Sequence, residues 1–208
     1  MRPSVDYSLY FCTDRGLMSS ATIEENVEAA LTGGATVVQL REKHCSSREF
    51  YELAVRVRAI ARRFGAPLIV NDRVDIALAA GADGVHVGQS DLPCAAVRRL
   101  VGEGMLVGVS AGSVAEALAA AREGADYLGV GAMYATGTKE DAGLVTMEEL
   151  KNIRRAVELP IVVIGGIIKA TLGNFKGMGI EGIAVVSAIA AQKDPTAAAR
   201  ELLTLWKS

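Results

Sequence analysis

Histidine and cysteine are scarce in this sequence, which limits the metal and nucleophilic chemistry open to it. Two histidines, His44 and His86, cannot form a three-histidine zinc site or an HExxH motif. The three cysteines, Cys12, Cys45 and Cys94, are widely spaced and form no CxxC pair. This spacing argues against a disulfide framework and against a zinc knuckle.

Long runs of one charge or of apolar residues are also missing. The 208 residues carry 22 basic and 24 acidic side chains, a net charge of -2, and no basic run is longer than two residues. A nucleic-acid partner is therefore not expected. The longest apolar stretch, near Ile161 to Ile168, is far shorter than the ~20 residues that cross a bilayer, and the chain starts without a sustained apolar segment. We expect a soluble cytoplasmic protein without a membrane partner, and leave its oligomeric state open, with a homodimer among the alternatives.

Short apolar runs rich in β-branched residues alternate with helical patterns along the whole chain. Each run is too short for a helix and is typical of a buried strand. The eight runs are Leu9–Cys12, Val37–Leu40, Leu68–Val70, Gly84–Val87, Leu106–Val109, Tyr127–Val130, Ile161–Ile164 and Ile183–Val186. Strands that alternate with helices form a parallel sheet, so the pattern predicts one α/β domain over residues 1–208, a minimal (β/α)8 TIM barrel. The alternative is an open doubly wound sheet, but its GxGxxG motif does not follow the first strand.

Several helix starts carry a capping signal. Three segments have the spacing of a capping box, in which a hydroxyl and a carboxylate each accept a hydrogen bond from a free backbone N–H. They are Ser46-x-x-Glu49, Ser113-x-x-Glu116 and Thr146-x-x-Glu149. Asp194-Pro195 combines an N-cap residue with proline at the first helical position. These signals place helices between the predicted strands.

Polar residues or glycines follow nearly every predicted strand. The carboxyl ends of parallel strands meet at one face of a barrel, so these residues are expected to surround one ligand. They include Gln39, Arg41 and Lys43, then Asn71, Asp72, Asp91 and Ser110, and finally Thr136, Thr138, Lys139, Gly165, Gly166 and Ser187. The sequence therefore predicts a site at the mouth of the barrel.

Two parts of this set suggest particular ligands. Gly165-Gly166 and Val186-Ser187 follow the last two strands, where TIM barrels commonly hold a phosphate, although the glycines could simply form a tight turn. Asp72 and Asp91 offer the hard oxygen ligands that Mg²⁺ prefers, although each could instead cap a helix. Beside the cations Arg41 and Lys43, the carboxylates favour a metal-bridged diphosphate.

Two further features have a simpler interpretation. The Thr136-x-Thr138-Lys139 run is a second candidate anion site or a solvated loop, and it is no Walker A motif. His86 lies in a predicted buried strand and is interpreted as a structural histidine, with nothing nearby to form a relay with it. No thiol chemistry is assigned to Cys45 or Cys94.

Taken together, the motifs at the barrel mouth resemble the signature of the thiamine phosphate synthase family in their order and spacing. They are Gln39-Leu-Arg-Glu-Lys43, Asn71-Asp72-Arg73, His86-Val-Gly-Gln89-x-Asp91, Gly-Val-Ser110, Thr136-x-Thr138-Lys139, Ile164-Gly-Gly-Ile167 and Val185-Val-Ser187. The resemblance implies a transferase of thiamine biosynthesis that joins 4-amino-5-hydroxymethyl-2-methylpyrimidine diphosphate to a thiazole phosphate and releases diphosphate. Its partners would be these small-molecule substrates, and its cofactor would be Mg²⁺.

The resemblance also implies a role for each matching residue. Contacts to the pyrimidine diphosphate would come from Gln39, Arg41, Lys43, Asn71, Ser110 and Lys139, of which Arg41, Lys43, Ser110 and Lys139 would be catalytic. Asp72 and Asp91 would hold Mg²⁺. The thiazole phosphate would be received by Thr136, Thr138, Gly166, Val186 and Ser187.

The implied chemistry needs no general base, because the attacking thiazole nitrogen carries a lone pair and no proton. If the carbon–oxygen bond breaks before the attack, the thiazole nitrogen attacks a resonance-stabilised pyrimidine methyl cation. The main demand is then stabilisation of the departing diphosphate, which magnesium and cationic side chains meet. Three positions depart from the family pattern. Ala132 replaces a usual proline, Gly112 stands where a histidine often occurs, and Met133 is atypical. These three departures affect the expected shape of the pocket and the expected order of the loop before Thr136, whereas the expected diphosphate and metal positions are intact.

Two other functions compete with the synthase. A thiazole tautomerase has a similar fold but releases no diphosphate, so Asp72, Asp91 and the Thr-x-Thr-Lys run speak against it. A noncatalytic phosphate-binding or regulatory barrel is compatible with the fold, because fold alone does not determine function.

Overall fold

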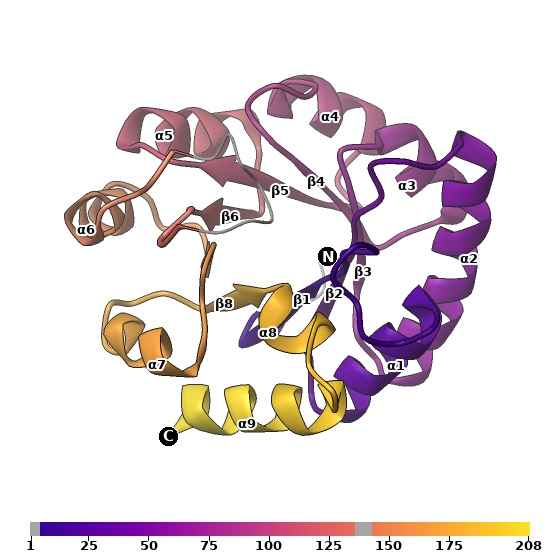
Figure 1. Ribbon diagram of the computed structural model, residues 1–208. Coiled ribbons are helices and arrows are strands. Elements are labelled where there is room, and N and C mark those ends of the chain that lie inside the picture. Colours follow the sequence, from indigo (N-terminus) through magenta and orange to yellow (C-terminus); the bar gives the residue numbers. More distant parts are fainter. Residues whose placement is uncertain (1–4, 136–142) are drawn as a thin grey trace.

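The computed structural model describes residues 5–135 and 143–208, and within them eight parallel strands close into a barrel in the order β1 to β8 (Figure 1). The strands are β1 (Leu9–Cys12), β2 (Val37–Leu40), β3 (Leu68–Asn71), β4 (Gly84–Val87), β5 (Leu106–Ala111), β6 (Tyr127–Val130), β7 (Ile161–Ile164) and β8 (Gly182–Val185). Each pairs in parallel with its neighbours in the sequence, and β1 pairs with β8. The predicted TIM barrel is confirmed, and an open sheet is excluded.

Most of the helices surround the barrel as an outer ring (Figure 1). The helices are α1 (Ile23–Thr32), α2 (Ser47–Arg63), α3 (Val74–Ala80), α4 (Cys94–Val101), α5 (Val114–Glu123), α6 (Met147–Ala156), α7 (Lys169–Leu172), the 3-10 turn η1 (Gly173–Phe175), α8 (Ser187–Ala190) and α9 (Pro195–Lys207). The short α8 lies inside α9, closer to the strands (Figure 1). Among the residues described, no helix is both long and apolar enough to cross a membrane.

The predicted caps begin the helices as expected, but only one of the three predicted boxes is complete. Ser46 and Glu49 exchange both hydrogen bonds at the start of α2. At α6, Thr146 accepts from the Glu149 N–H, but the Glu149 carboxylate accepts from the backbone of Val114 instead. The reciprocal box predicted there is therefore wrong, because a neighbouring helix start offered the carboxylate another free N–H.

Of the other two predicted caps, one lacks the reciprocal hydrogen bond and one forms as predicted. Ser113 accepts from the Glu116 N–H, whereas the Glu116 carboxylate accepts from Gly112, so this box is also incomplete. Asp194 caps α9 by accepting from the Ala197 N–H at 2.9 Å, as predicted. A complete capping box between Thr22 and Glu25 begins α1, although it is not among the boxes predicted from the sequence.

Two apolar clusters hold the barrel together, and they alternate along the strands. Tyr10, Ile69 and Tyr127 belong to the cluster that fills the barrel, whereas the next residues, such as Val70 and Leu128, belong to the cluster that faces the helices. This alternation follows from the two-residue period of a strand. Both faces of each strand are buried, which explains why the strands read as continuous apolar runs.

At the amino ends of the strands, a repeated pair of hydrogen bonds joins each odd-numbered strand to the even-numbered strand that follows it. In each case the residue before an even-numbered strand binds the first or second residue of the preceding strand, through both its side chain and its backbone. The side chains of Thr36, Asp83, Asp126 and Glu181 accept from the N–H groups of Leu9, Leu68, Val107 and Ile161. The backbone N–H groups of the same four residues donate to the carbonyls of the same four partners. We call these the amino-end clamps, and they satisfy groups that the strand ladder leaves unpaired.

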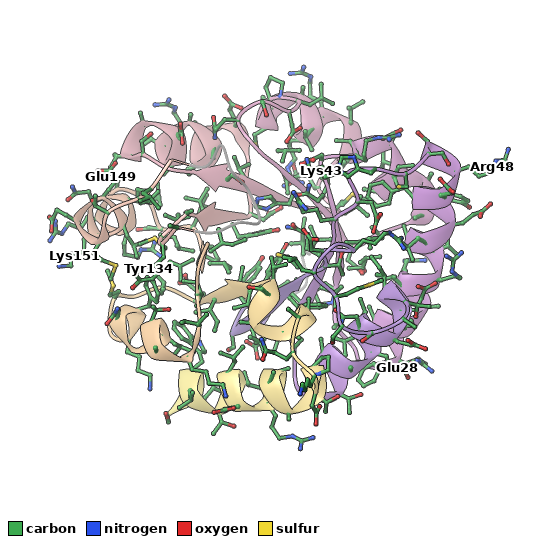
Figure 2. The ribbon with its side chains drawn as sticks, in the orientation of Figure 1. Glu28, Lys43, Arg48, Tyr134, Glu149 and Lys151 are labelled. Carbon is green, nitrogen blue, oxygen red and sulfur yellow. The ribbon has the colours of Figure 1, made fainter. Side chains whose placement is uncertain are left out.

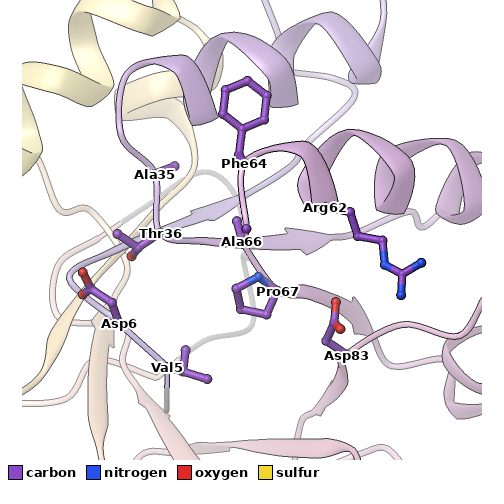
Figure 3. A pocket seen from close by; sticks show the side chains of 10 residues that line it. Val5, Asp6, Ala35, Thr36, Arg62, Phe64, Ala66, Pro67 and Asp83 are labelled. Carbon is purple, nitrogen blue, oxygen red and sulfur yellow. The ribbon is translucent and has the colours of Figure 1, made fainter. Parts of the chain in front are cut away.

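A cavity at this end of the barrel is lined by residues including Val5, Asp6, Thr36, Phe64 and Asp83 (Figure 3). Three of its polar side chains are already used within the chain. Thr36 and Asp83 belong to the amino-end clamps, and the Asp6 carboxylate accepts from the Ser8 N–H at 2.9 Å. This end is therefore organised for stability, and the predicted site residues lie at the opposite end.

Candidate active site at the barrel mouth

Two predicted carboxylates meet at the carboxyl ends of β3 and β4. Asp72 follows β3 with a φ of 64°, in the left-handed region that non-glycine residues rarely occupy. Lys43 donates from Nζ to Asp72 Oδ2 at 2.5 Å. Burial and the Asp72 carboxylate both raise the pKa of Asp91, against the opposing effects of the Gly88 N–H and Lys43. The predicted juxtaposition of the two aspartates is confirmed.

The alternative that these aspartates cap helices is not supported. The N-cap residues of α3 and α4 are Arg73 and Pro93, and neither helix start has a side-chain cap. The Asp91 carboxylate instead accepts from the Gly88 N–H within its own loop at 2.8 Å. The unusual backbone of Asp72 is also typical of positions where function, rather than stability, determines the conformation.

The donor set of this pair suits magnesium better than zinc. No group of three or more histidine, cysteine, aspartate or glutamate side chains that could hold a metal occurs in the part of the chain that the structure describes. Structural zinc sites use four protein ligands and catalytic sites three, whereas Mg²⁺ is commonly held by one or two carboxylates, with water and phosphate completing its octahedron. Two adjacent carboxylates beside a lysine therefore fit a magnesium ion that is shared with a phosphorylated ligand.

Arg41 is held at the mouth by a loop that sequence reasoning missed. Its Nη1 donates to Asp14 Oδ2 at 3.0 Å, and its backbone N–H donates to the buried Thr13 hydroxyl at 3.0 Å. Arg15, which follows Asp14, pairs with the almost fully buried Glu42 carboxylate. The loop after β1 thus aligns the loop after β2. No local sequence signal links the two loops, because the contacts depend on closure of the barrel.

A chain of hydrogen bonds crosses the barrel interior below the mouth. Gln39 Nε2 donates to the Tyr10 hydroxyl, which lies 2.8 Å from the Tyr127 hydroxyl. Tyr127 in turn contacts His86 Nδ1 at 3.1 Å, and His86 Nε2 lies 3.0 Å from Ser110 Oγ. His86 is a buried barrel residue, as interpreted from the sequence. The expectation that nothing nearby forms a relay with it is wrong, because strands distant in sequence bring two polar partners to its ring.

Gly108 makes room for this chain. A Cβ atom at this position would lie 2.1 Å from Tyr127 Cζ and 2.5 Å from His86 Nδ1. We expect Gly108→Ala to cost about 1–3 kcal/mol of unfolding free energy, because the buried rings must shift to admit the methyl group. Urea unfolding monitored by circular dichroism measures this loss. Gly104→Ala is the matched control and should be nearly neutral, since apart from its chain neighbours no described residue lies within 4 Å of the position that a Cβ would take there. Equal losses for both variants would contradict the close packing at Gly108.

The remaining predicted residues lie on the same rim where the structure describes them. Gly165 and Gly166 both have positive φ and pack against Ala132 and Tyr134, so the turn alone accounts for the two glycines. Ser187 is the first residue of α8, directly after Val186. Asn71 ends β3 and pairs in register with His86. Thr136, Thr138 and Lys139 lie outside the described residues.

The departures from the family pattern can be located as well. Ala132 and Met133 are buried, and the Met133 N–H donates to the Ile164 carbonyl at 2.9 Å. The three residues from Ala132 to Tyr134 thus form a wall beside the end of β7. Gly112 is exposed after β5. Figure 2 shows Lys43 over the barrel, whereas Arg48 and Lys151 lie at the periphery of the molecule.

A closed parallel barrel that collects two cations, two carboxylates and a buried polar chain at its carboxyl end belongs to the class of TIM-barrel enzymes, which bind their substrates at this face. The sequence profile described as thiamine monophosphate synthase matches residues 9–189. The chain belongs to this family, and its curated relatives named thiamine-phosphate synthase are transferases.

Individual relatives agree with this assignment. The chain is 60% identical over 202 residues to the thiamine-phosphate synthase of Clostridium beijerinckii, covering 97% of each chain. It is 54% identical over 206 residues to that of Ruminiclostridium cellulolyticum, covering 99% of this chain and 98% of the relative. Among solved structures, the thiamine phosphate pyrophosphorylase of Pyrococcus furiosus superposes with a TM-score of 0.90 at 39% identity, covering 97% and 96% of the two chains. The family resemblance indicated by the motifs is confirmed.

Proposed function

We propose that this chain condenses 4-amino-5-hydroxymethyl-2-methylpyrimidine diphosphate with a thiazole phosphate, giving thiamine phosphate and diphosphate. The observation that carries the proposal is the cluster of Lys43, Asp72 and Asp91 at the barrel mouth. A catalyst that only moves protons on a thiazole phosphate has no diphosphate to release and no evident use for this cluster. A noncatalytic phosphate-binding barrel has no need of paired carboxylates, which repel an anion unless a cation lies between them.

The two substrates would occupy different parts of the rim. Gln39, Arg41, Lys43, Asn71, Ser110 and Lys139 would bind the pyrimidine diphosphate. Thr136, Thr138, Gly166, Val186 and Ser187 would bind the thiazole phosphate. This division is supported by the fold, since the ends of the last two strands of a TIM barrel commonly bind phosphate.

In the reaction, the bond between the pyrimidine methylene carbon and the diphosphate oxygen breaks, and its electron pair leaves with the diphosphate. The thiazole nitrogen then uses its lone pair to form the new carbon–nitrogen bond. Arg41 and Lys43 would oppose the negative charge that develops on the leaving oxygen. A bound Mg²⁺, held by Asp72 and Asp91, would supply further positive charge at the diphosphate. No proton has to be removed from the nucleophile, so no residue of the chain is assigned as a general base.

The direct test is to mix purified protein with both substrates and MgCl₂ and to measure thiamine phosphate and diphosphate by chromatography. We expect the two products in equal amounts, and neither product when the thiazole phosphate is omitted. Conversion of one thiazole tautomer to another without condensation would favour the tautomerase. Saturable binding of the phosphorylated substrates without turnover would favour the noncatalytic barrel. Parallel reactions with plain and carboxylated thiazole phosphate identify the accepted form.

A further inference from the structure

The polar chain inside the barrel links two residues of the proposed site. Gln39, on β2, and Ser110, on β5, are its ends, and Tyr10, Tyr127 and His86 are its interior members. Its four links measure 2.9, 2.8, 3.1 and 3.0 Å. Tyr10 and Tyr127 are at most 2% exposed and Gln39 and His86 at most 8%. A buried chain of this kind has a direction, because each hydroxyl carries a single proton.

Gln39 determines that direction. Its amide nitrogen can only donate, so the Tyr10 oxygen accepts this bond. Burial raises the pKa of both Tyr10 and Tyr127, which therefore keep their protons. The Tyr10 proton then goes to the Tyr127 oxygen, which lies 2.8 Å away. The Tyr127 proton must accordingly go to His86 Nδ1.

The opposite order leaves a proton without an acceptor. If Tyr127 donated to Tyr10, the Tyr10 oxygen would accept two hydrogen bonds and its own buried proton would have no acceptor among the described residues. An unsatisfied buried donor is strongly disfavoured. With His86 Nδ1 as an acceptor, the ring proton resides on Nε2, where Ser110 Oγ accepts it.

We propose that Gln39 sets the direction of this chain, so that His86 is held as the Nε2–H tautomer and Ser110 keeps its hydroxyl proton for an acceptor atom of the ligand. Tyr10, Tyr127 and His86 are then positioning residues that act through Ser110. The Ser110 carbonyl accepts from Gln89 Nε2, which fixes the backbone of the same residue. The tautomer is a property of the protein alone, and only the use of the Ser110 proton rests on the proposed function.

The tautomer can be measured without any substrate. Imidazole ¹⁵N chemical shifts distinguish Nδ1–H, Nε2–H and doubly protonated rings, and a His44→Gln background leaves one histidine to observe. We expect His86 to be neutral with its proton on Nε2. Gln39→Glu replaces the donor with an acceptor, so it should reverse the chain and move the proton to Nδ1. An Nδ1–H or doubly protonated ring in the parent protein, or a tautomer that Gln39→Glu leaves unchanged, would overturn the proposal.

Activity then tests whether Ser110 uses its proton on the ligand. Tyr10→Phe interrupts the chain without touching Ser110 and should lower kcat/KM for the pyrimidine diphosphate about tenfold, with KM for the thiazole phosphate unchanged. Adding Tyr10→Phe to Ser110→Ala should cost nothing further, because both act through one hydroxyl. Tyr7→Phe is the control, since the Tyr7 ring contacts Tyr127 although Tyr7 is not a member of the chain defined above. Additive losses would overturn the role of Ser110, whereas a failed condensation in the parent protein would leave the ¹⁵N result to decide the tautomer.

Discussion

The Asp91→Asn variant is expected to lose at least about a hundredfold of the magnesium-dependent turnover while it unfolds at nearly the same urea concentration as the parent protein. Asparagine keeps the size of the side chain and an oxygen that can accept from the Gly88 N–H, a bond of 2.8 Å in the structure. What it removes is one of two neighbouring negative charges. Initial rates over a series of MgCl₂ concentrations measure the loss.

Stability should not fall with activity, because the carboxylate is held in an unfavourable environment. Burial and the neighbouring Asp72 raise the pKa of Asp91, so its ionised form is destabilised in the folded protein. Neutralising it relieves this repulsion, and any change in unfolding free energy should be small or positive.

Asp75→Asn is the matched control for this variant. Asp75 also lies close to the end of β3, but its exposed carboxylate pairs with Arg73 on the surface. Its replacement should leave both the rate and the magnesium dependence almost unchanged. If Asp91→Asn unfolds far more readily than the parent protein, or if its magnesium dependence is unaltered, the assignment of Asp91 as a metal ligand is wrong.

The barrel could be predicted because its strands are buried on both faces. Runs such as Val37–Leu40 are apolar throughout apart from an occasional polar residue such as Gln39, and their alternation with capped helices leaves few other architectures. The meeting of Asp72 and Asp91 followed from the same reasoning, since both residues come shortly after neighbouring strands. Each of these predictions needs only the residues of short segments and the rule that the carboxyl ends of parallel strands lie at the same face of the barrel.

Features that depend on barrel closure could not be predicted in this way. Tyr10 and Tyr127 stand in apolar runs and look like ordinary core residues, yet their hydroxyls meet across the barrel. Gly108 gave no signal, although its missing side chain admits the Tyr127 ring. The pairing of Asp14 with Arg41 joins two loops whose sequences are unrelated. In each case the partner is specified by the register of strands far apart in sequence, which composition and periodicity do not determine.

The amino-end clamps lead to the largest expected effect on stability. Arg98, on α4, reinforces the clamp formed by Asp126, to which it donates from Nη2. Its guanidinium also donates to the carbonyls of Gly102, Met105 and Gly124. The side chains of Arg98 and Asp126 are only 11% and 6% exposed. We expect Arg98→Met to cost about 3–5 kcal/mol of unfolding free energy, because it removes the cation beside a buried carboxylate and the donor to several carbonyls.

Three further variants separate this contribution from a general effect of losing an arginine. Arg99→Met changes the next residue, which is exposed on the same helix, and should alter the unfolding free energy by less than about 0.5 kcal/mol. Arg98→Lys retains the charge but not the planar set of donors, so it should be intermediate. Adding Asp126→Asn to Arg98→Met should recover part of the loss, because it removes the buried negative charge that Arg98 no longer pairs with, while an amide oxygen still accepts from the Val107 N–H. The losses are measured from urea unfolding midpoints, provided that the dependence of the unfolding free energy on urea concentration is unchanged. Equal losses for Arg98→Met and Arg99→Met would contradict the specific role of Arg98. Because Arg98 lies at the amino end of the barrel, turnover per folded molecule should stay at the parent level in every one of these variants.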